Sequence, residues 1–422
     1  MLSLSRTAVL TALCATIFWV ASPTVLPGSA GAAVRQAGSG AAVSAGLAGT
    51  DTIRNNQQWV LDTMDVPAAW QLSQGAGVTV AVIDSGVNPY ISDLAGTVIT
   101  GPDFTGVDTR PSDPNWGVHG TWMASLIAGH GHDGGGSGII GIAPKSTILS
   151  IRVIPDRADP HYGQYEHEQE TRIQQSLADG INYAVQHGAK VISMSIGYST
   201  ASGTVKEALQ NAYSHGAVVV ASAGNSGAQA GASDDDQAPE SFPADYPGVI
   251  SVGAVDSGGA VAGFSSDNLS VEVAAPGVKV PAQGRDGQYW LVSGTSPACA
   301  LVAGVAALIK SRYPDLAPNL VAAALTSTTT DRPAGGYDSQ VGFGIVDAPA
   351  ALAKAGQLAG DRPGRIGIVA TASFGGGPRA VPQEPVTPRG PGQLVLFALL
   401  AVASLALVGV AGTRLAVLGR NS

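Results

Sequence analysis

Short apolar runs, rich in β-branched residues, recur along the middle of the chain and predict the strands of a sheet. These runs lack the strict alternation of a strand with one wet face, so both faces of each strand are expected to be covered. Five stretches have this character: Val78–Ile83, Ile148–Ile154, Val191–Ile196, Val218–Ala221 and Val249–Val255.

Apolar residues at helical spacing separate several of these runs. One pattern stops at Gly188 and another at Gly216, as expected for helix ends. Strands that alternate with helices indicate an α/β fold with a mostly parallel sheet and helices on both faces. No internal repeat or long linker interrupts the stretch from Val60 to about Ala355, so one domain is expected over residues 59–360. The helical positions are Ile173, Leu177, Ile181, Ala184 and Val185, and then Val205, Leu209, Ala212 and Tyr213.

The first 32 residues have the order of features that is typical of a secretory signal peptide. Arg6 precedes an apolar run from Ala8 to Val20, and small residues follow at Ala30-Gly31-Ala32. A retained membrane anchor is the alternative, but the run is short for a span. Residues 1–32 are therefore expected to be removed, and residues 33–58 form an N-terminal arm.

A second apolar stretch, Leu394–Gly412, contains 19 residues and no charged side chain. As a helix it would be about 28 Å long, enough to cross the hydrocarbon core of a membrane. Arg414 and Arg420 follow in the tail 413–422, and positive charge beside a span marks the cytoplasmic side. Residues 361–393 are rich in Pro, Gly and Arg and predict a tether. The body is thus expected outside the cytoplasm, on one C-terminal transmembrane helix, unless 394–412 is a buried core helix.

Composition and charge exclude several classes of protein. Hydrophobic residues make up 45% and charged residues 13%, about half the usual charged share, so most of the chain is not disordered. The net charge is −9, and because the two ends carry +5, residues 33–360 carry −14. This balance argues against nucleic acid as a partner. Cys14 lies in the expected signal peptide, which leaves Cys299 without an internal disulfide partner, as a buried small hydrophobe.

Polar residues stand where strands end and helices begin. Ligands of open parallel sheets bind beyond the carboxyl ends of the strands, so these residues are the first candidates for a site. Asp84 ends a strand in AVIDSGV, and Asn225 follows a strand in VVVASAGN. His119 opens a helical pattern in HGTWMASLIAG. Ser296 stands directly before the apolar helix in SGTSPACALVAGVAALI, with Pro297 expected as its first residue.

These blocks together resemble the subtilisin-like serine peptidases, the subtilases, from about Trp59 to Ala355. The order Asp, His, Ser along the chain is that of subtilisin. The resemblance implies a serine endopeptidase with a subtilisin-like α/β domain that cleaves polypeptides. We expect no cofactor and no catalytic metal, and the sequence leaves open whether a calcium site exists. The resemblance rests on the segments VTVAVIDSGV, VHGTWMASLIAG, VVVASAGNSG, GTSPACALVAGVAAL and FPADYPGVISVGAV.

The resemblance implies a role for each of these residues. Ser296 would be the nucleophile, and His119 would accept its proton. Asp84 would hold the imidazole tautomer and stabilise the imidazolium. The Asn225 side chain and the Ser296 N–H would bind the oxyanion. Two facing segments would line the substrate pocket: Ser195, Ile196 and Gly197, and Ser222, Ala223 and Gly224.

Some residues depart from the family pattern or imitate other sites. Pro297, Cys299 and Ala300 depart from the usual serine block, and Trp122 replaces a frequent second histidine; we interpret these changes as pocket tuning or drift. The spacing of Gly129, Gly131 and Gly134 matches a dinucleotide motif but follows a helix instead of a strand. Three polar clusters are better explained as solvated loops than as metal or calcium sites: His130, His132 and Asp133; His161, Glu166 and His167; and Asp234–Asp236.

The order of the parts narrows the resemblance to the mycosins, membrane-anchored subtilases associated with type VII secretion. The entry QWVLDTMDVPAAWQLSQGAGVTVAVIDSGV is also similar to theirs. The implied function is the processing of secreted proteins beside a type VII secretion membrane complex. The arm is too short for a folded inhibitory prodomain and is expected to lie on the surface. Two alternatives stay open: a general degradative subtilase on the cell surface, and a catalytically silent structural partner of a membrane complex.

Overall fold

The structure is a computed structural model, and it describes residues 35–36, 50–166, 170–227 and 240–360. The predicted signal peptide, tether, transmembrane helix and tail lie outside these residues. Within the described ranges, no helix has both the length and the apolar character that a membrane crossing requires.

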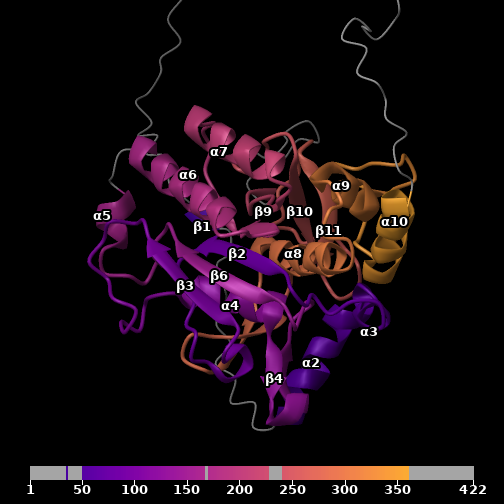
Figure 1. Cartoon of the computed structure of the whole chain (residues 1–422), viewed down its shortest axis with the longest axis horizontal. Coiled ribbons are helices and arrows are strands. Elements are labelled where there is room, and N and C mark those ends of the chain that lie inside the picture. Colours follow the sequence, from indigo (N-terminus) through magenta and orange to yellow (C-terminus); the bar gives the residue numbers. More distant parts are fainter. Residues whose placement is uncertain (1–34, 37–49, 167–169, 228–239, 361–422) are drawn as a thin grey trace, which may run out of the picture. The chain divides into compact units, whose positions relative to one another are not determined.

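A seven-stranded sheet forms the centre of the body, with the strand order β11-β10-β9-β7-β2-β6-β3 (Figure 1). All neighbouring strands in it are parallel. The five predicted runs correspond to β2, β6, β7, β9 and β10, whereas the edge strands β3 and β11 were not predicted. β3 escapes the pattern because it is a largely exposed edge strand, VITGPD. The bounds are Thr79–Asp84 for β2, Val98–Asp103 for β3, Thr147–Arg152 for β6, Val191–Met194 for β7, Val218–Ser222 for β9, Val249–Val255 for β10 and Val271–Pro276 for β11.

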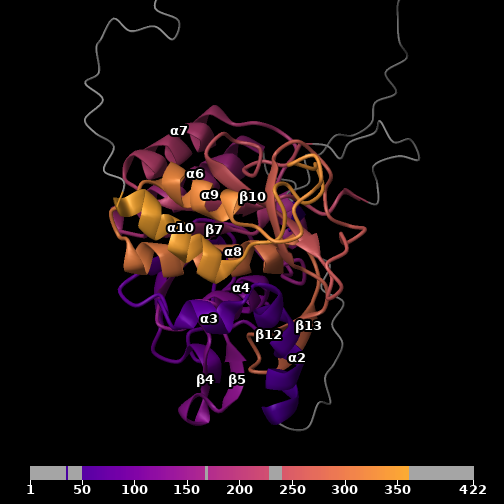
Figure 2. The same cartoon turned by 90° about the vertical axis from the view of Figure 1, so that its right-hand side faces the viewer.

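Helices cover both faces of the sheet, which confirms this part of the predicted fold. Successive side chains of a strand point to opposite faces. In β2, Val80 and Val82 join the core under helices α4 and α8, and Ala81 and Ile83 join the core under α6 and α7. Figure 2 shows α6 and α7 on one side of β7 and α4 and α8 on the other. The bounds are Val118–Ala128 for α4, Glu170–Gln186 for α6, Gly203–Ser214 for α7 and Thr295–Arg312 for α8.

Shorter elements complete the body. Helix α10 packs against α3, α8 and α9. Two antiparallel hairpins, β4–β5 and β12–β13, lie with α2 at one end of the body (Figure 2). The bounds are Val66–Trp70 for α3, Pro318–Ser327 for α9, Ala348–Gly360 for α10, His130–His132 for β4, Ser137–Ile140 for β5, Val280–Gln283 for β12, Tyr289–Val292 for β13, Ser92–Leu94 for η1, Asp133–Gly135 for η2 and Tyr162–Glu166 for α5.

Helix α2, Thr50–Thr63, crosses the boundary that the sequence predicts between the arm and the domain at residue 59. Ile53 and Gln57 are 2% and 1% exposed. The Gln57 side chain donates to the carbonyl of Ile140 in β5 at 2.6 Å and accepts from its N–H at 3.1 Å. The body therefore includes α2, which begins at Thr50 within the predicted arm. A polar residue makes this contact, so hydrophobic periodicity does not reveal it.

Two residues of the arm form strand β1, Arg35–Gln36, which pairs with strand β8, Ile196–Gly197. The pairing is antiparallel, with Arg35 opposite Gly197 and Gln36 opposite Ile196. The described part of the arm thus lies on the body, at a segment that the resemblance assigns to substrate binding.

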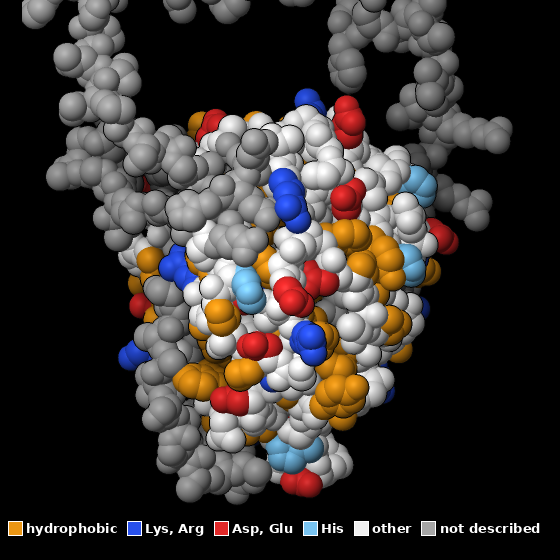
Figure 3. Space-filling model, turned by 90° about the vertical axis from the view of Figure 1, so that its left-hand side faces the viewer, with side chains coloured by type: hydrophobic (Ala, Val, Ile, Leu, Met, Phe, Trp, Pro, Cys, Tyr) orange, Lys and Arg blue, Asp and Glu red, His pale blue; other side chains and the backbone are white. Residues whose placement is uncertain are grey.

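The surface near α5 and β3 carries side chains of every kind. On the face seen from the left of Figure 1, acidic, basic and apolar side chains are interspersed (Figure 3). Elsewhere on the body, large apolar side chains such as Tyr213 in α7, 40% exposed, also reach the surface, which is common in folded proteins.

Candidate active site

The carboxyl ends of three neighbouring strands bring predicted site residues to one edge of the sheet. Asp84 is the last residue of β2, Ser195 directly follows β7, and Ser222 is the last residue of β9. β2 lies between β6 and β7, so the strands that follow β2 in the sequence are placed on both sides of it. Such a switch point is where open parallel sheets form their ligand crevice.

Asp84 and His119 form a buried hydrogen-bonded pair. The Nδ1 atom of His119 lies 2.8 Å from Oδ1 and 2.9 Å from Oδ2 of Asp84, and the two residues are 4% and 1% exposed. Because an ionised carboxylate can only accept, this hydrogen-bond network assigns the proton to Nδ1 and leaves Nε2 as the basic nitrogen. The pair thus fixes the tautomer that a general base needs.

The glycine after His119 allows α4 to approach the end of β2. A Cβ atom on Gly120 would lie 2.2 Å from the carbonyl oxygen of Gly86. The Gly120 N–H donates to the Ser85 hydroxyl at 3.1 Å. Any larger residue would push the helix, and His119 with it, away from Asp84.

Helix α8 begins at Thr295, so Ser296 is its second residue and does not precede it. Pro297 is therefore the third helical residue, not the first as predicted. The first four N–H groups of a helix have no intrahelical partner, so proline costs no hydrogen bond at either position. Ser296 is 1% exposed, and its Oγ has no hydrogen-bond partner among the described residues.

Asn225 lies against the start of α8. Its Oδ1 accepts from the Thr295 N–H at 2.9 Å and from the Thr295 hydroxyl at 3.0 Å. Since both contacts are made by the amide oxygen, the Nδ2 group is the end of the side chain that can donate to another acceptor. The sequence did not single out Thr295, although it stands in the same motif as Ser296.

The two segments predicted to line the substrate pocket both lie close to Ser296 and to each other. Ser195 Oγ donates to the carbonyl oxygen of Ser296 at 3.2 Å, and the Gly224 N–H donates to Thr295 Oγ1 at 3.2 Å. Ser241 Oγ would lie 2.6 Å from a Cβ on Gly197 and 3.2 Å from a Cβ on Gly224. One hydroxyl thus lies between the segments, and no pattern in the sequence pointed to it.

Trp122 and Cys299 both depart from the family pattern, and the structure shows what each of them contacts. The Trp122 ring meets the His119 ring edge to face, with centroids 6.3 Å apart, and lies 6.2 Å from the ring of Trp290. Cys299 is fully buried, and this burial raises the pKa of its thiol to about 12. The predicted role of Cys299 as a buried hydrophobe is confirmed.

Histidines of two of the polar clusters that resemble metal sites in the sequence each lie beside an aspartate. His132 Nδ1 lies 2.7 Å from Asp93 Oδ1, and His161 Nδ1 lies 3.3 Å from Asp159 Oδ1. In the part of the chain that the structure describes, no group of three or more His, Cys, Asp or Glu side chains could hold a metal ion. Asp234–Asp236 and His167 lie outside the described residues.

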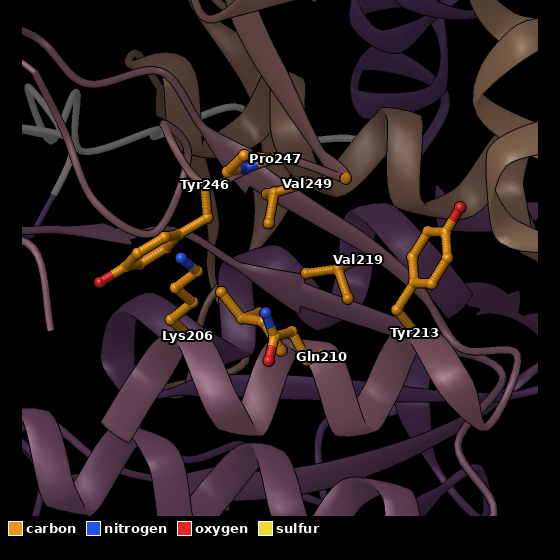
Figure 4. A pocket seen from close by; sticks show the side chains of 9 residues that line it. Lys206, Gln210, Tyr213, Val219, Tyr246, Pro247 and Val249 are labelled. Carbon is orange, nitrogen blue, oxygen red and sulfur yellow. The ribbon is translucent and has the colours of Figure 1, made fainter. Parts of the chain in front are cut away.

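A cavity of about 460 Å³ lies at the opposite ends of the strands. Its lining includes Val219 near the start of β9 and Val249 at the start of β10, and α7 closes it (Figure 4). None of its lining residues belongs to the predicted site. The candidate active site is therefore the region around Asp84, His119 and Ser296, and not this cavity.

The sequence profile of the subtilase family matches residues 75–344. The chain belongs to the subtilase family. Subtilisin DY of Bacillus licheniformis is 36% identical to this subtilase over 278 residues, which cover 66% of this chain and 92% of subtilisin DY. Thermitase of Thermoactinomyces vulgaris is 34% identical over 262 residues, which cover 62% and 85% of the two chains.

Solved structures of mycosins are also similar to this subtilase. MycP1 from Mycobacterium smegmatis has a TM-score of 0.57 at 30% identity, covering 70% of this chain and 84% of that chain. The MycP3 protease from the type VII (ESX-3) secretion system has a TM-score of 0.58 at 30% identity, covering 78% and 90%. The resemblance to subtilases and mycosins is thus confirmed. The chain is a subtilisin-like serine endopeptidase, structurally close to the mycosins of type VII secretion.

Proposed function

We propose that this subtilase is a membrane-anchored, extracytoplasmic endopeptidase that processes secreted proteins of a type VII secretion system. The observation that carries the catalytic part is the buried Asp84–His119 pair beside the helix that begins with Thr295-Ser296. The likeness to MycP1 and MycP3, from the ESX-1 and ESX-3 type VII secretion systems, supports the context. The apolar stretch 394–412 supports the anchor.

In the proposed reaction, Ser296 Oγ attacks the carbonyl carbon of the scissile peptide bond. His119 Nε2 accepts the Ser296 proton and then donates it to the leaving amine, while Asp84 holds the opposite ring nitrogen. Water then hydrolyses the acyl-enzyme by the same route. This sequence of steps needs the tautomer that the Asp84 contacts favour.

The negative oxygen of the tetrahedral intermediate needs hydrogen-bond donors that are already in place. We assign these donors to Asn225 Nδ2 and the N–H of Ser296. The contacts of Asn225 Oδ1 with Thr295 support this assignment, because they turn the NH₂ group away from Thr295. Such preorganised donors stabilise the charge that develops in the transition state.

The substrate backbone would pair with Ser195, Ile196 and Gly197 as an additional strand. The antiparallel pairing of β1 with β8 supports this assignment, since it demonstrates that the edge of β8 can accept a strand. Ser241 between Gly197 and Gly224 favours a small side chain at the substrate residue that supplies the scissile carbonyl. Ser222, Ala223 and Gly224 would form the opposite wall.

The catalytic part is tested by labelling with a fluorophosphonate, which reacts with an activated serine. We expect the wild-type protein to be labelled and to cleave peptides, and Ser296→Ala to lose both properties while it keeps its melting temperature. Loss of the nucleophile in subtilisin lowers kcat by about 10⁶. A well-folded wild type without labelling would instead favour the silent structural partner. A broad cleavage profile on unfolded proteins would favour the general degradative subtilase.

The substrate-binding segment is tested by removing residues 33–49, which deletes β1 and leaves α2 in place. If β1 and the substrate compete for β8, this deletion lowers KM for a peptide substrate and leaves kcat close to the wild-type value. An unchanged KM would contradict the shared use of β8. The body is expected to fold without this segment, whereas a deletion that extends to residue 55 also removes the buried Ile53 and destabilises the protein.

The proposed anchoring is tested with protease added to intact, wall-stripped cells. We expect release of a soluble, active fragment that ends within 361–393. Protection of this segment, with cleavage in the tail after Arg414 instead, would reverse the proposed topology.

A further inference from the structure

Asp156 lies in the loop between β6 and α5 and is buried against the start of α4. It is 3% exposed. Its Oδ2 accepts from the Val118 N–H at 2.8 Å, and its Oδ1 accepts from the N–H of His119 at 2.9 Å. A buried carboxylate thus holds the backbone of His119 itself, while Asp84 holds its ring.

The start of α4 needs such a partner. Its N-cap residue is Gly117, which has a φ of 74° and offers no side chain to the free N–H groups of the first turn. The positive end of the helix dipole favours a negative charge at this point. Asp156, 37 residues after His119 in the chain, supplies both the hydrogen-bond acceptor and the negative charge. Burial raises the pKa of Asp156, and the two N–H groups oppose this effect.

A fully buried arginine fixes the loop that carries Asp156. Arg152, 1% exposed, donates through Nη2 to Asp159 at 3.0 Å and through Nε to the carbonyl oxygen of Ser85 at 3.2 Å. The Asp159 N–H in turn donates to the carbonyl oxygen of Asp156 at 2.9 Å. Arg152 therefore ties the Asp156 loop to the residue that follows Asp84, so the two carboxylates around His119 keep a fixed relative position.

We propose that Asp156 is a positioning residue for the general base: it fixes the backbone of His119 and adds a second negative charge that stabilises the imidazolium formed during catalysis. This inference rests on the proposed function of His119 and Ser296. Two carboxylates would then act on the proposed general base: Asp84 on the His119 ring and Asp156 on the His119 main chain.

The charged or titratable groups that face Asp156 in the described part of the chain include His119, Asp84 and Arg285. His119 on α4 favours its ionised form, and Asp84 on β2 disfavours it. Arg285, between β12 and β13, is attracted to Asp156 and donates through Nη2 to the carbonyl oxygen of Pro111 at 2.6 Å. Without the charge of Asp156, the His119 imidazolium has one negatively charged neighbour fewer. A cation that loses a nearby anion is less stable, so the pKa of the imidazolium falls.

The test compares Asp156→Asn and Asp156→Ser with the matched control Asp93→Asn. The serine keeps an acceptor for the helix start without a charge. Asp93 is another fully buried carboxylate that accepts from a backbone N–H, that of Ile139 at 2.7 Å, but it lies outside the proposed site. The readouts are kcat and KM against pH, and the titration of His119 by NMR in a Ser296→Ala background.

For both Asp156 variants we expect kcat to fall roughly ten- to hundredfold at little change in KM. The acid limb of the kcat/KM profile and the NMR titration of His119 should both move to lower pH by roughly half a unit or more. Asp93→Asn should move neither.

A folded Asp156→Asn variant with the wild-type His119 titration would overturn the inference and leave Asp156 as a helix cap only. If the wild type proves to have no peptidase activity, the proposed function fails, but the NMR titration still decides whether Asp156 acts on His119.

Discussion

Among the described residues, two histidine rings lie within 2.8 Å of a buried aspartate, and only one of these pairs lies in the candidate site. The distances from Nδ1 to Oδ1 are nearly equal, 2.8 Å for His119–Asp84 and 2.7 Å for His132–Asp93. Both aspartate side chains are almost fully buried, at 1% and 0% exposure. By distance and burial of the acid alone, the pairs cannot be told apart.

The difference lies in what surrounds each pair. Asp93 also accepts from the Ile139 N–H at 2.7 Å and the Tyr289 hydroxyl at 3.2 Å, and it thereby fastens η1 to both hairpins. The His132 ring is 26% exposed, and its Nε2 faces the exposed carboxylate of Asp133 at 3.7 Å. His119 instead lies on α4, which packs against α8, and Ser296 is the second residue of α8. A His–Asp pair becomes a base only where its second nitrogen meets a nucleophile.

The sharpest test of this comparison exchanges each aspartate for asparagine. Asp84→Asn should lower kcat by about 10⁴, the value for the same change in a serine-peptidase triad, because the imidazole loses its tautomer and the stabilisation of its charge. Asp93→Asn should leave kcat/KM within about twofold of the wild-type value, since it touches no group near Ser296. Equal losses of activity in the two folded variants, measured with a peptide substrate, would contradict the proposed difference between the two His–Asp pairs.

Asn225→Ala should have a smaller effect. Removing one oxyanion donor of this kind costs about 10²–10³ in kcat, with little change in KM, because the interaction forms mainly in the transition state. Steady-state kinetics would show a loss mainly in KM if Asn225 acted on the bound substrate instead.

Asp93→Asn should act on stability. The Ile139 N–H and the His132 ring lose a charged acceptor, and such a loss costs on the order of 1–3 kcal/mol. Urea unfolding should report this cost as a lower midpoint at an unchanged slope. A midpoint equal to the wild-type value would mean that the pair does not fasten the hairpins.

The smallest effect concerns Glu272 in β11, a largely buried carboxylate without a histidine. Burial raises its pKa from the ordinary value of 4.5 to about 7, and its Oε2 has no hydrogen-bond partner in the described ranges. Between these two pH values the folded state therefore binds more protons than the unfolded state, so the stability falls as pH rises across this window.

Glu272→Gln should remove this dependence. The variant should melt a few degrees above the wild type at pH 8 and close to it at pH 4, because both states of the wild type are protonated at the lower pH. A constant difference in melting temperature across this range would contradict the assignment.

The sequence predicted the sheet centre, the four covering helices α4, α6, α7 and α8, and the residues at the strand ends, because these features depend on local apolar runs and on blocks that resemble a known family. It missed the edge strand β3, whose exposed residues carry no apolar pattern. It also placed α2 partly in the arm, because the contact of Gln57 with Ile140 joins residues 83 positions apart.

Within the site, the missed residues have a common property. Asp156, Arg152 and Ser241 act through hydrogen bonds or close approaches to residues distant in the chain. Arg152 is a charged residue inside the predicted apolar run Ile148–Ile154. Nothing in the local sequence of Asp156 or Ser241 distinguishes these two residues from acidic or small residues of ordinary loops. The same holds for Asp93, so the partner of His132 could be found only from the fold.

Helix α8 links the proposed nucleophile to the packing of the body. Ser296 is the second residue of a helix whose residues are buried from Thr295 to Lys310, and a Cβ on Gly304 would lie 2.5 Å from the Cβ of Ile142. A substitution that shifted this helix would disturb folding and reactivity together. Engineering of the substrate preference should therefore keep α8 unchanged and vary single side chains of the proposed pocket, such as Ser241.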